Sequence, residues 1–375
     1  SVRPPIRMRR MRPRFRFLAV LATLLLSQAP ATRAIAAAPD LSTLRLPPGF
    51  VIEVWADEVA SARSLARGDR GTVFVGTRAG SVYAVRDEAG RRKVSTIARG
   101  LNMPNGVAFR GGALYVGELT RILRYDQIES RLDSPPEPTV IAELPGERHH
   151  GWRYIAFGPD DKLYVAIGAP CNVCDRDREG FGQILRMNAD GSGREVVARG
   201  VRNSVGFAWH PRTRQLWFTD NGRDMLGDDV PSCELNRVSR PGEHFGFPFC
   251  HAGDVVDPQF GTLGRCADAT APALKLGPHV APLGLRFYRG TQFPAALRGS
   301  LLIAEHGSWN RSEKIGYRVM RVRVDGERAS GYEEFIGGWL KPDGSVTGRP
   351  VDLLELDDGP LLLSVDVAGV VYRMS

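Results

Sequence analysis

The sequence predicts an all-β fold, a six-bladed β-propeller, from a repeat and from the absence of long helical periodicity. A short apolar strand between turn residues recurs six times after residue 39, and a second strand that often carries arginine follows each copy. Short strands at a spacing near that of one four-stranded blade are typical of propellers. The apolar strands are centred on Val73, Leu114, Leu163, Leu216, Leu301 and Leu361.

Two further segments complete the predicted architecture. Residues 49–56, GFVIEVWA, have the pattern of one more strand, which we expect to close the ring against the C-terminal blade. Leu216 and Leu301 lie 85 residues apart, which is too long for one blade. We therefore expect a long insertion, about 223–290, between the fourth and fifth strand repeats of a single propeller domain that spans 39–375.

The first 38 residues have the order of a secretory signal peptide. A basic stretch precedes an apolar run at 17–26, and a stretch of small residues ends before Pro39. The apolar run is too short to span a bilayer comfortably. We expect an exported protein, periplasmic or secreted, with no membrane span.

The net charge of +8 comes from this leader. Residues 1–38 contain eight arginines and no acidic residue, so the rest of the chain has a net charge near zero. A protein that binds nucleic acid or a membrane surface would be expected to carry an excess of positive charge there. The composition therefore argues against both functions.

The five cysteines all lie after the leader, where disulfides are allowed. CNVC at 171–174 fits a zinc half-site, a redox motif or a short disulfide loop. No second C-x-x-C completes a zinc site, and Asp175 stands where a c-type haem motif needs histidine. A structural disulfide is favoured, Cys250 with Cys266 is a second plausible pair, and Cys233 is then left over. The connectivity stays open.

Propellers carry out chemistry where loops from different blades converge on the central channel. A functional residue should therefore precede or follow an apolar strand at an equivalent point of its repeat. The residues that do so are His150, Arg202, Asn203, Gly222, Arg223 and His306.

Four motifs in order resemble the glucose/sorbosone dehydrogenase family of soluble quinoproteins, most closely its sorbosone-dehydrogenase-like branch. They are HHGWRYIAFGPDDKLYVAIGAPCNVC, ARGVRNSVGFAWHP, LWFTDNGRDMLGDD followed by ELN, and AEHGSWNRS. The resemblance covers nearly all of the chain after the leader. It implies a six-bladed propeller that uses pyrroloquinoline quinone (PQQ) and calcium to oxidise a sugar.

The resemblance implies a catalytic role for His150, because a neutral imidazole can take the hydroxyl proton. Arg202 and Asn203 match the family's Arg-Asn pair. They are expected to bind PQQ, and Arg202 also to stabilise negative charge on the reduced ring. His149 stands where the glucose enzymes tend to have aspartate. We place it in the substrate pocket with Arg153 and His306.

The turn DNGRDMLGDD is the predicted calcium site. Calcium prefers oxygen ligands, and glycine lets backbone carbonyls converge. The resemblance implies that the carbonyls of Gly222 and Arg223 hold the ion beside PQQ. Asp228, Asp229 and Glu234 are expected to bind the same ion, a second structural calcium, or only solvent.

PQQ carries three carboxylates, so its site needs cations. Arg311, Lys314 and Arg349 are the candidates, and Trp309 is a candidate for stacking on the flat cofactor. Val351 is apolar where the glucose enzymes have a further arginine.

Two other functions stay open. One is a calcium-dependent lactonase-type propeller, whose ion would be held by converging carboxylates and asparagines. The other is a non-catalytic extracellular binding propeller. For the favoured function, the partners are a small sugar and a separate electron acceptor, since the chain has no haem motif. The sugar, the acceptor and the oligomeric state stay open.

Overall fold

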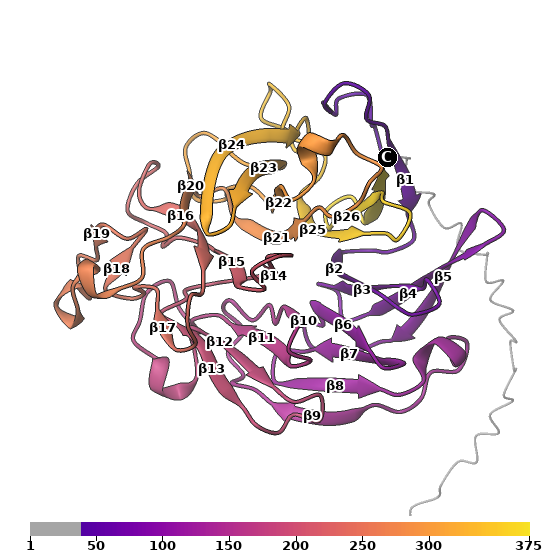
Figure 1. Cartoon of the computed structure of the whole chain (residues 1–375), viewed down its shortest axis with the longest axis horizontal. Coiled ribbons are helices and arrows are strands. Elements are labelled where there is room, and N and C mark those ends of the chain that lie inside the picture. Colours follow the sequence, from indigo (N-terminus) through magenta and orange to yellow (C-terminus); the bar gives the residue numbers. More distant parts are fainter. Residues whose placement is uncertain (1–38) are drawn as a thin grey trace, which may run out of the picture. The chain divides into compact units, whose positions relative to one another are not determined.

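A computed structural model describes residues 39–375, so the predicted signal peptide lies outside the described part. Six small antiparallel sheets surround a central channel, with the first strand of each sheet nearest the centre (Figure 1). This arrangement confirms the predicted all-β, six-bladed propeller. Each sheet is called a blade below and is numbered from the N-terminus.

Blades 1 to 3 follow one another along the chain. Blade 1 contains β2 (Ala62–Arg67), β3 (Val73–Thr77), β4 (Val82–Glu88) and β5 (Arg91–Ala98). Blade 2 contains β6 (Gly106–Arg110), β7 (Ala113–Gly117), β8 (Arg121–Tyr125) and β9 (Thr139–Glu143). Blade 3 contains β10 (Ile155–Phe157), β11 (Leu163–Ile167), β12 (Gln183–Met187) and β13 (Glu195–Arg199).

Blades 4 to 6 complete the ring. Blade 4 contains β14 (Phe207–Trp209), β15 (Leu216–Asp220), β16 (Ser232–Arg237) and β20 (Leu274–Pro278). Blade 5 contains β21 (Pro282–Phe287), β22 (Leu301–Glu305), β23 (Arg318–Asp325) and β24 (Arg328–Ile336). Blade 6 contains β25 (Pro350–Glu355), β26 (Leu361–Val365), β27 (Val370–Met374) and β1 (Ile52–Ala56).

The second strand of each blade explains why the repeat is so visible in the sequence. β3, β7, β11, β15, β22 and β26 are buried at every position. A strand covered by neighbouring blades on both faces reads as a continuous apolar run rather than as an alternation. Six apolar clusters, one between each pair of adjacent blades, form the core.

The ring is closed by the strand predicted for this purpose. β1 pairs antiparallel with β27, from Ile52 opposite Met374 to Ala56 opposite Val371. Blade 6 therefore combines an N-terminal strand with three C-terminal strands. Residues from the two ends of the described chain are thus fixed in one sheet.

The segment predicted as an insertion, 223–290, also holds regular blade strands, namely β16, β20 and β21. The additional segment proper is 238–273, between β16 and β20. In it β17 (Glu243–His244) joins blade 3 in parallel with β13. A small hairpin, β18 (Cys250–His251) with β19 (Val255–Val256), lies at the periphery of the ring (Figure 1).

Both candidate disulfides are present. Cys171 is bonded to Cys174, and Cys250 to Cys266, while Cys233 is a buried free thiol. The second bond closes the additional segment on itself.

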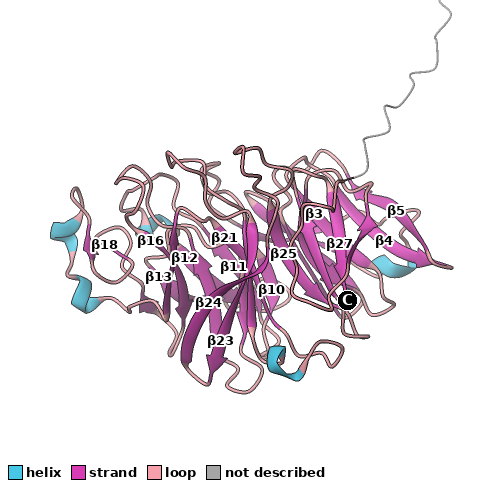
Figure 2. Cartoon of the chain, turned by 90° about the horizontal axis from the view of Figure 1, so that it is seen from above, coloured by secondary structure: helices cyan, strands magenta, loops and turns pink. Residues whose placement is uncertain are grey.

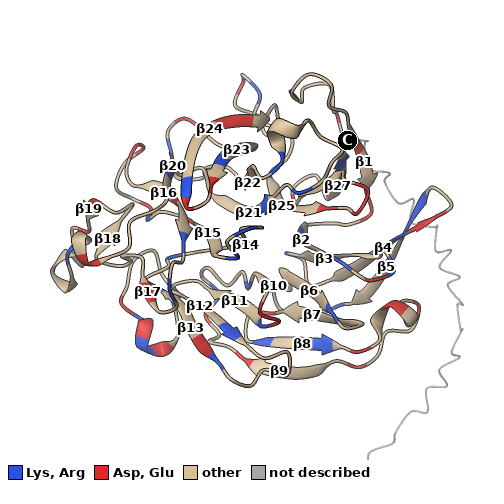
Figure 3. Cartoon of the chain, viewed as in Figure 1, with Lys and Arg blue, Asp and Glu red and all other residues tan. Residues whose placement is uncertain are grey.

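Helices are a minor part of the structure (Figure 2). Within 39–375 they are short 3₁₀ turns: η1 (Ile128–Ser130), η2 (Asp177–Glu179), η3 (Gly261–Leu263), η4 (Cys266–Asp268) and η5 (Ala295–Leu297). None of the helices in this range is long and apolar enough to cross a membrane. Basic and acidic residues are interspersed over the blades (Figure 3), as expected for a chain whose described part is nearly neutral.

Candidate active site

A cavity of about 270 Å³ lies where loops of five blades converge. The first and second strands of a blade are antiparallel, so the residues before the first and after the second share one end of the channel. Two groups of polar residues border the cavity. The His150 wall consists of His150, Arg202, Asn203 and Gly222. The Asp366 wall consists of Arg63, Arg78, His306 and Arg349, which line the cavity, and Asp366, which binds three of them.

His150 precedes β10 and is held in one tautomer. Its Nδ1 lies 2.9 Å from the carbonyl oxygen of Ala169, which can only accept, so Nδ1–H is the donor. Nε2 of the neutral ring then carries the lone pair. Burial, and next the charge of Arg202, hold the pKa of His150 well below its usual value. The imidazole is therefore a neutral base at pH 7.

The backbone around His150 is specialised for this position. His150 has a φ of 50°, a left-handed conformation that is uncommon for a residue other than glycine. A Cβ on Gly168 would lie 2.6 Å from the Cβ of His150, so only glycine fits there. Backbone strain of this kind is often found at functional sites.

His149 lies beside His150, with the two ring centroids 4.1 Å apart. Its side chain is more exposed than that of His150, and it does not line the cavity. Partial burial and the charge of Arg202 lower the pKa of His149.

Arg202 is fixed by four charge-assisted hydrogen bonds. Nε and Nη2 donate to the backbone oxygen and to Oδ1 of Asn172, each at 2.8 Å. Nη2 also donates to Asp224 Oδ2 at 2.9 Å, and Nη1 to the Asn221 oxygen at 3.1 Å. One of the five guanidinium N–H groups is left for a ligand. The CNVC disulfide loop thus presents Asn172 to this arginine.

Asn203 is positioned through its backbone and leaves its side chain free. Asp220, at the end of β15, accepts the backbone N–H groups of Arg202 at 2.8 Å and Asn203 at 2.6 Å. Oδ1 of Asn203 is buried and has no hydrogen-bond partner among the described residues. A buried polar atom without a partner costs free energy, which a bound ligand would recover.

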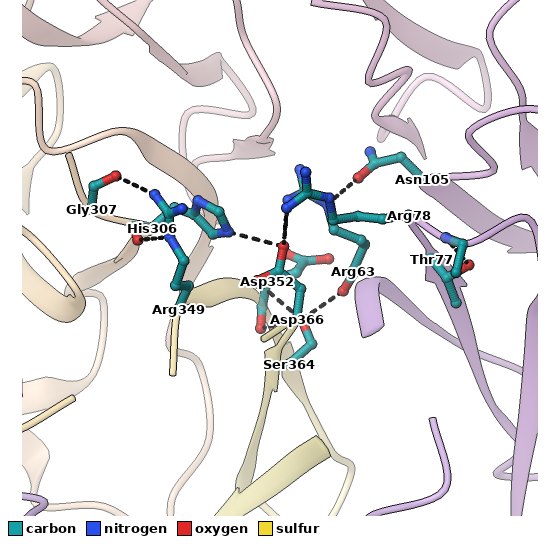
Figure 4. Close-up of polar contacts among 11 residues, drawn as sticks. Arg63, Thr77, Arg78, Asn105, His306, Gly307, Arg349, Asp352, Ser364 and Asp366 are labelled. Atoms are coloured by element: carbon teal, nitrogen blue, oxygen red, sulfur yellow. Dashed lines mark hydrogen bonds and ion pairs between the residues drawn. The ribbon is translucent and has the colours of Figure 1, made fainter. Parts of the chain in front are cut away.

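The Asp366 wall is assembled from blades 1, 5 and 6 (Figure 4). Asp366, after β26, binds Nη1 of Arg63 at 3.1 Å and Nε2 of His306 at 2.9 Å. Nη1 of Arg78 lies 3.5 Å from the same oxygen. Burial alone would raise the pKa of Asp366, but the bond from His306 and the two arginines lower it. Burial lowers the pKa of His306 to about 4.

His306 therefore has the opposite tautomer to His150, with Nε2–H donated to a carboxylate. Arg349 supports it from blade 6, donating Nε to the His306 carbonyl at 2.9 Å and Nη2 to the Gly307 carbonyl at 2.6 Å. Val205, Leu283 and Val351 form a small apolar cluster, and the first two also line the cavity.

Comparison with known proteins places the chain in a family. Residues 44–334 match the family described as TrAA12-like. The chain belongs to the TrAA12-like family. An uncharacterised protein of Borreliella burgdorferi is 35% identical over 355 residues, which is 91% of this chain and 93% of the relative.

Solved structures share the fold of this TrAA12-like chain. The holo PQQ domain of pyranose dehydrogenase from Coprinopsis cinerea matches with a TM-score of 0.76 and 18% identity, over 88% of this chain and 97% of that one. A calcium structure of carbohydrate-active enzyme family AA12 from Trichoderma reesei matches with a TM-score of 0.74 and 20% identity, over 88% and 96%. The resemblance to soluble PQQ-dependent sugar dehydrogenases is thereby confirmed.

Besides His149, three residues predicted for ligand binding in this TrAA12-like chain lie away from the cavity. Arg153 is fully buried and donates to the carbonyls of Leu119, His150 and Pro145, so it supports the His150 loop. Arg311 binds the Asp228 carbonyl, and Lys314 binds the Gly344 carbonyl. Trp309 does line the cavity, and it is 70% exposed.

The three acidic residues predicted as calcium ligands do not converge on one site. Asp228 accepts from Ser312, and Asp229 pairs with Arg311. Glu234 is buried in β16 opposite Asp220, and burial raises the pKa of both carboxyl groups. Within 39–375 no three His, Cys, Asp or Glu side chains are placed to hold a metal ion.

The backbone carbonyls predicted as calcium ligands have no other hydrogen-bond role. No donor in the described part of the chain binds the carbonyl oxygens of Gly222 or Arg223. Gly222 lines the cavity, and the side chain of Arg223 turns away to pair with buried Asp257. Uncommitted carbonyls suit calcium.

The TrAA12-like site fits PQQ on three features of its own residues. The guanidinium groups of Arg202 and Arg349 face the cavity and suit the cofactor's carboxylates, since arginine binds carboxylates with a planar pair of donors. The side-chain oxygen of Asn203 has no partner, and the carbonyls of Gly222 and Arg223 are free to hold an ion beside the cofactor.

Several residues that line the cavity were not predicted from the sequence: Arg63, Arg78, Trp152, Asn221, Asp224 and His279. The same holds for Asn172, Asp220 and Asp366, which bind lining residues. The repeat held a signal for two of them. Arg78 follows β3 and Asp366 follows β26, just as His306 follows β22. Aligning the position after the second strand in all six blades would have found both.

Proposed function

We propose that this protein is an exported PQQ- and calcium-dependent dehydrogenase that oxidises an aldose or a related sugar aldehyde or alcohol. The observation that carries the proposal is His150, whose Nδ1–H is donated to Ala169, which leaves the Nε2 lone pair for a substrate. Two of the similar structures support the proposal: the holo PQQ domain of the pyranose dehydrogenase from Coprinopsis cinerea and the calcium structure of family AA12 from Trichoderma reesei. We assign the chain to the sorbosone-dehydrogenase-like branch on its motifs.

A bound PQQ would supply the acceptor for the hydride that leaves the sugar carbon. Nε2 of His150 accepts the proton of the same sugar hydroxyl, so the substrate loses two electrons and two hydrogens and gains a C=O bond. The remaining N–H of Arg202 stabilises the negative charge that develops nearby. Because Arg202 is already fixed by four hydrogen bonds, no reorganisation is required at that moment.

The residues that would hold the cofactor come from blades 4 and 6. Arg202, Arg349 and Nδ2 of Asn203 would donate to its oxygens, Oδ1 of Asn203 would accept from a cofactor N–H, and the carbonyls of Gly222 and Arg223 would hold calcium. Trp309, exposed at the rim, would cover a bound ligand. The electrons then leave to a separate acceptor.

The direct test uses metal-stripped protein. PQQ and Ca²⁺ are added separately and together, PQQ binding is followed by tryptophan fluorescence, and dye reduction is measured over a panel of aldoses. We expect PQQ to bind with calcium, and dye reduction to need both. Omission of calcium is the matched control.

A different outcome would redirect the assignment. Absence of PQQ binding would overturn the proposal. Hydrolysis of a lactone by the calcium-loaded protein would favour the lactonase-type alternative. Sugar binding without turnover by the PQQ-loaded protein would favour the non-catalytic binding propeller.

A further inference from the structure

The Asp366 wall carries more positive charge than it balances itself. Three guanidinium groups, those of Arg63, Arg78 and Arg349, surround the single carboxylate of Asp366. His306 does not change this balance, because at pH 7 it is neutral and only donates a hydrogen bond to the same carboxylate. An anion that enters the cavity on this side therefore meets an excess of cations.

Two of these arginines have donors to spare. Arg63 uses Nε for Asn105 at 2.8 Å and Nη1 for Asp366, and its Nη2 has no partner among the described residues. The only polar partner of the Arg78 side chain in the same range is Asp366, at 3.5 Å, and the side chain is 45% exposed. Arg349 donates Nε and one Nη2 hydrogen to two carbonyls, and its remaining N–H groups are the ones proposed above for the cofactor.

Trp152 holds the two arginines beside the proposed base. The guanidinium carbons of Arg63 and Arg78 lie 4.8 Å and 5.3 Å from its ring centroid. Such cation–π contacts hold the guanidinium groups against the indole while their remaining N–H groups can still bind a ligand. Trp152 is two residues from His150, so an anion bound by these arginines lies near the group that accepts the substrate proton.

The order of blades separates this pair from the proposed cofactor ligands of blade 4. Arg202, Asn203 and Gly222 come from blade 4, and blade 1, which supplies Arg63 and Arg78, is opposite blade 4 in a ring of six. A cofactor held by blade 4 and by Arg349 of blade 6 would leave the guanidinium groups of blade 1 for the second ligand, the sugar.

We propose that Arg63 and Arg78 bind an anionic group of the substrate, so that the enzyme oxidises a sugar acid in preference to the neutral sugar. This inference rests on the proposed function and specifies its substrate class. The oxidised carbon still loses its hydride to PQQ and its hydroxyl proton to His150. The anionic group takes no part in that step.

The test compares matched sugars on the PQQ- and calcium-loaded protein. We expect kcat/KM for D-glucuronate to exceed that for D-glucose by about tenfold or more, the factor that one charge-assisted hydrogen bond supplies. The ratio should fall as salt rises from 20 mM to about 500 mM, since salt screens partly exposed charges such as Arg78. D-Glucose 6-phosphate tests whether phosphate is preferred to carboxylate.

The variant Arg78→Gln removes one charge and keeps the length of the side chain. It is chosen over a change at Arg63, whose buried pair with Asp366 supports the fold. We expect the glucuronate-to-glucose ratio of kcat/KM to fall about tenfold. Arg240→Gln, at an exposed position outside the cavity, should leave the ratio unchanged.

A binding measurement separates this inference from the proposed function. Glucuronate should raise the Tm of the cofactor-free protein more than glucose does, and Arg78→Gln should abolish that difference. PQQ binding with equal use of both sugars would overturn the inference and leave the proposed function intact. A large loss of PQQ affinity in Arg78→Gln would also overturn it, by assigning Arg78 to the cofactor. If the unmodified protein binds no PQQ, the proposed function itself is wrong, and the inference about its substrate falls with it.

Discussion

The two walls of the cavity are built in different ways. On the His150 wall, backbone groups and nearby amides fix each functional side chain, as Ala169 fixes His150 and Asn172 fixes Arg202. On the Asp366 wall, the side chains of arginines, an aspartate and a neutral histidine from three blades bind one another. The first arrangement gives a rigid base and a rigid donor. The second gives a positively charged surface, and the loss of any one residue of the Asp366 wall would change its charge or its geometry.

Two of the three histidines that line the cavity, His150 and His306, show the difference most directly. Burial lowers the pKa of both, so both are neutral at pH 7. His150 donates to a carbonyl and keeps Nε2 as its lone pair, whereas His306 donates Nε2–H to Asp366. Position on the cavity is therefore not enough to identify a base. The partner of the other ring nitrogen decides which atom can accept a proton.

The largest expected effect is on the base itself. His150→Ala should lower kcat/KM by about 10²- to 10⁴-fold, the usual contribution of general base catalysis. PQQ affinity should be retained, because His150 is not among the proposed cofactor ligands. Steady-state dye reduction and PQQ fluorescence titration measure the two quantities.

His306→Ala is the comparison that can break this assignment. We expect it to lose less activity than His150→Ala, since its Nε2 proton is committed to Asp366. Equal losses in the two variants would mean that the Asp366 wall supplies the base.

A smaller effect is expected when the charge cluster is broken. Asp366→Asn leaves the buried guanidinium of Arg63 without its anion and should lower the free energy of unfolding by about 3–5 kcal/mol at pH 7. The pKa of Asp366 is lowered in the folded state. Its contribution is therefore present above its unfolded pKa, near 4, and is lost as the pH falls below that value.

Urea-induced unfolding at pH 7 and pH 5 measures the loss of unfolding free energy in Asp366→Asn. The difference between Asp366→Asn and the unmodified protein should be similar at both values and narrow only below about pH 4. A gap that closes between pH 7 and pH 5 would assign the stabilisation to a titrating histidine instead.

The smallest expected effect belongs to a residue that sequence reasoning placed in the cofactor site. Lys314 is exposed and binds only the Gly344 carbonyl, so Lys314→Gln should change PQQ affinity by less than about twofold. Arg349→Gln, on the Asp366 wall, should weaken PQQ binding far more. Equal losses in the two titrations would return Lys314 to the site.

The fold was predictable because burial on both faces makes the second strand of each blade apolar throughout. The same physical reason explains why the predicted insertion, 223–290, extends beyond the additional segment at both ends. β20 reads LKLGP and has one exposed and three partly buried positions, so it lacks the apolar run that identified the other strands. Only its pairing with β16 shows that it belongs to blade 4.

The His150 wall was largely predictable, since its residues lie within short motifs at equivalent points of the repeat. The Asp366 wall was not. Arg63 and Asp366 are 303 positions apart, and in a sequence each looks like an ordinary charge on the surface. Closeness in the sequence, in contrast, suggested a shared calcium site that the side chains do not form. Asp229 and Glu234 are near each other along the chain, but Asp229 is exposed and Glu234 is buried in β16.

The closure of the ring by β1 has a consequence for the order of folding. Blade 6 cannot be completed until β1 and β27, which come from opposite ends of the described chain, have paired. Contacts between residues so far apart carry the largest loop-closure cost and form slowly. Arg63 and Asp366 meet across this same seam between blades 6 and 1. Ligand binding that requires the Asp366 wall would therefore serve in refolding experiments as a signal that the last blade is in place.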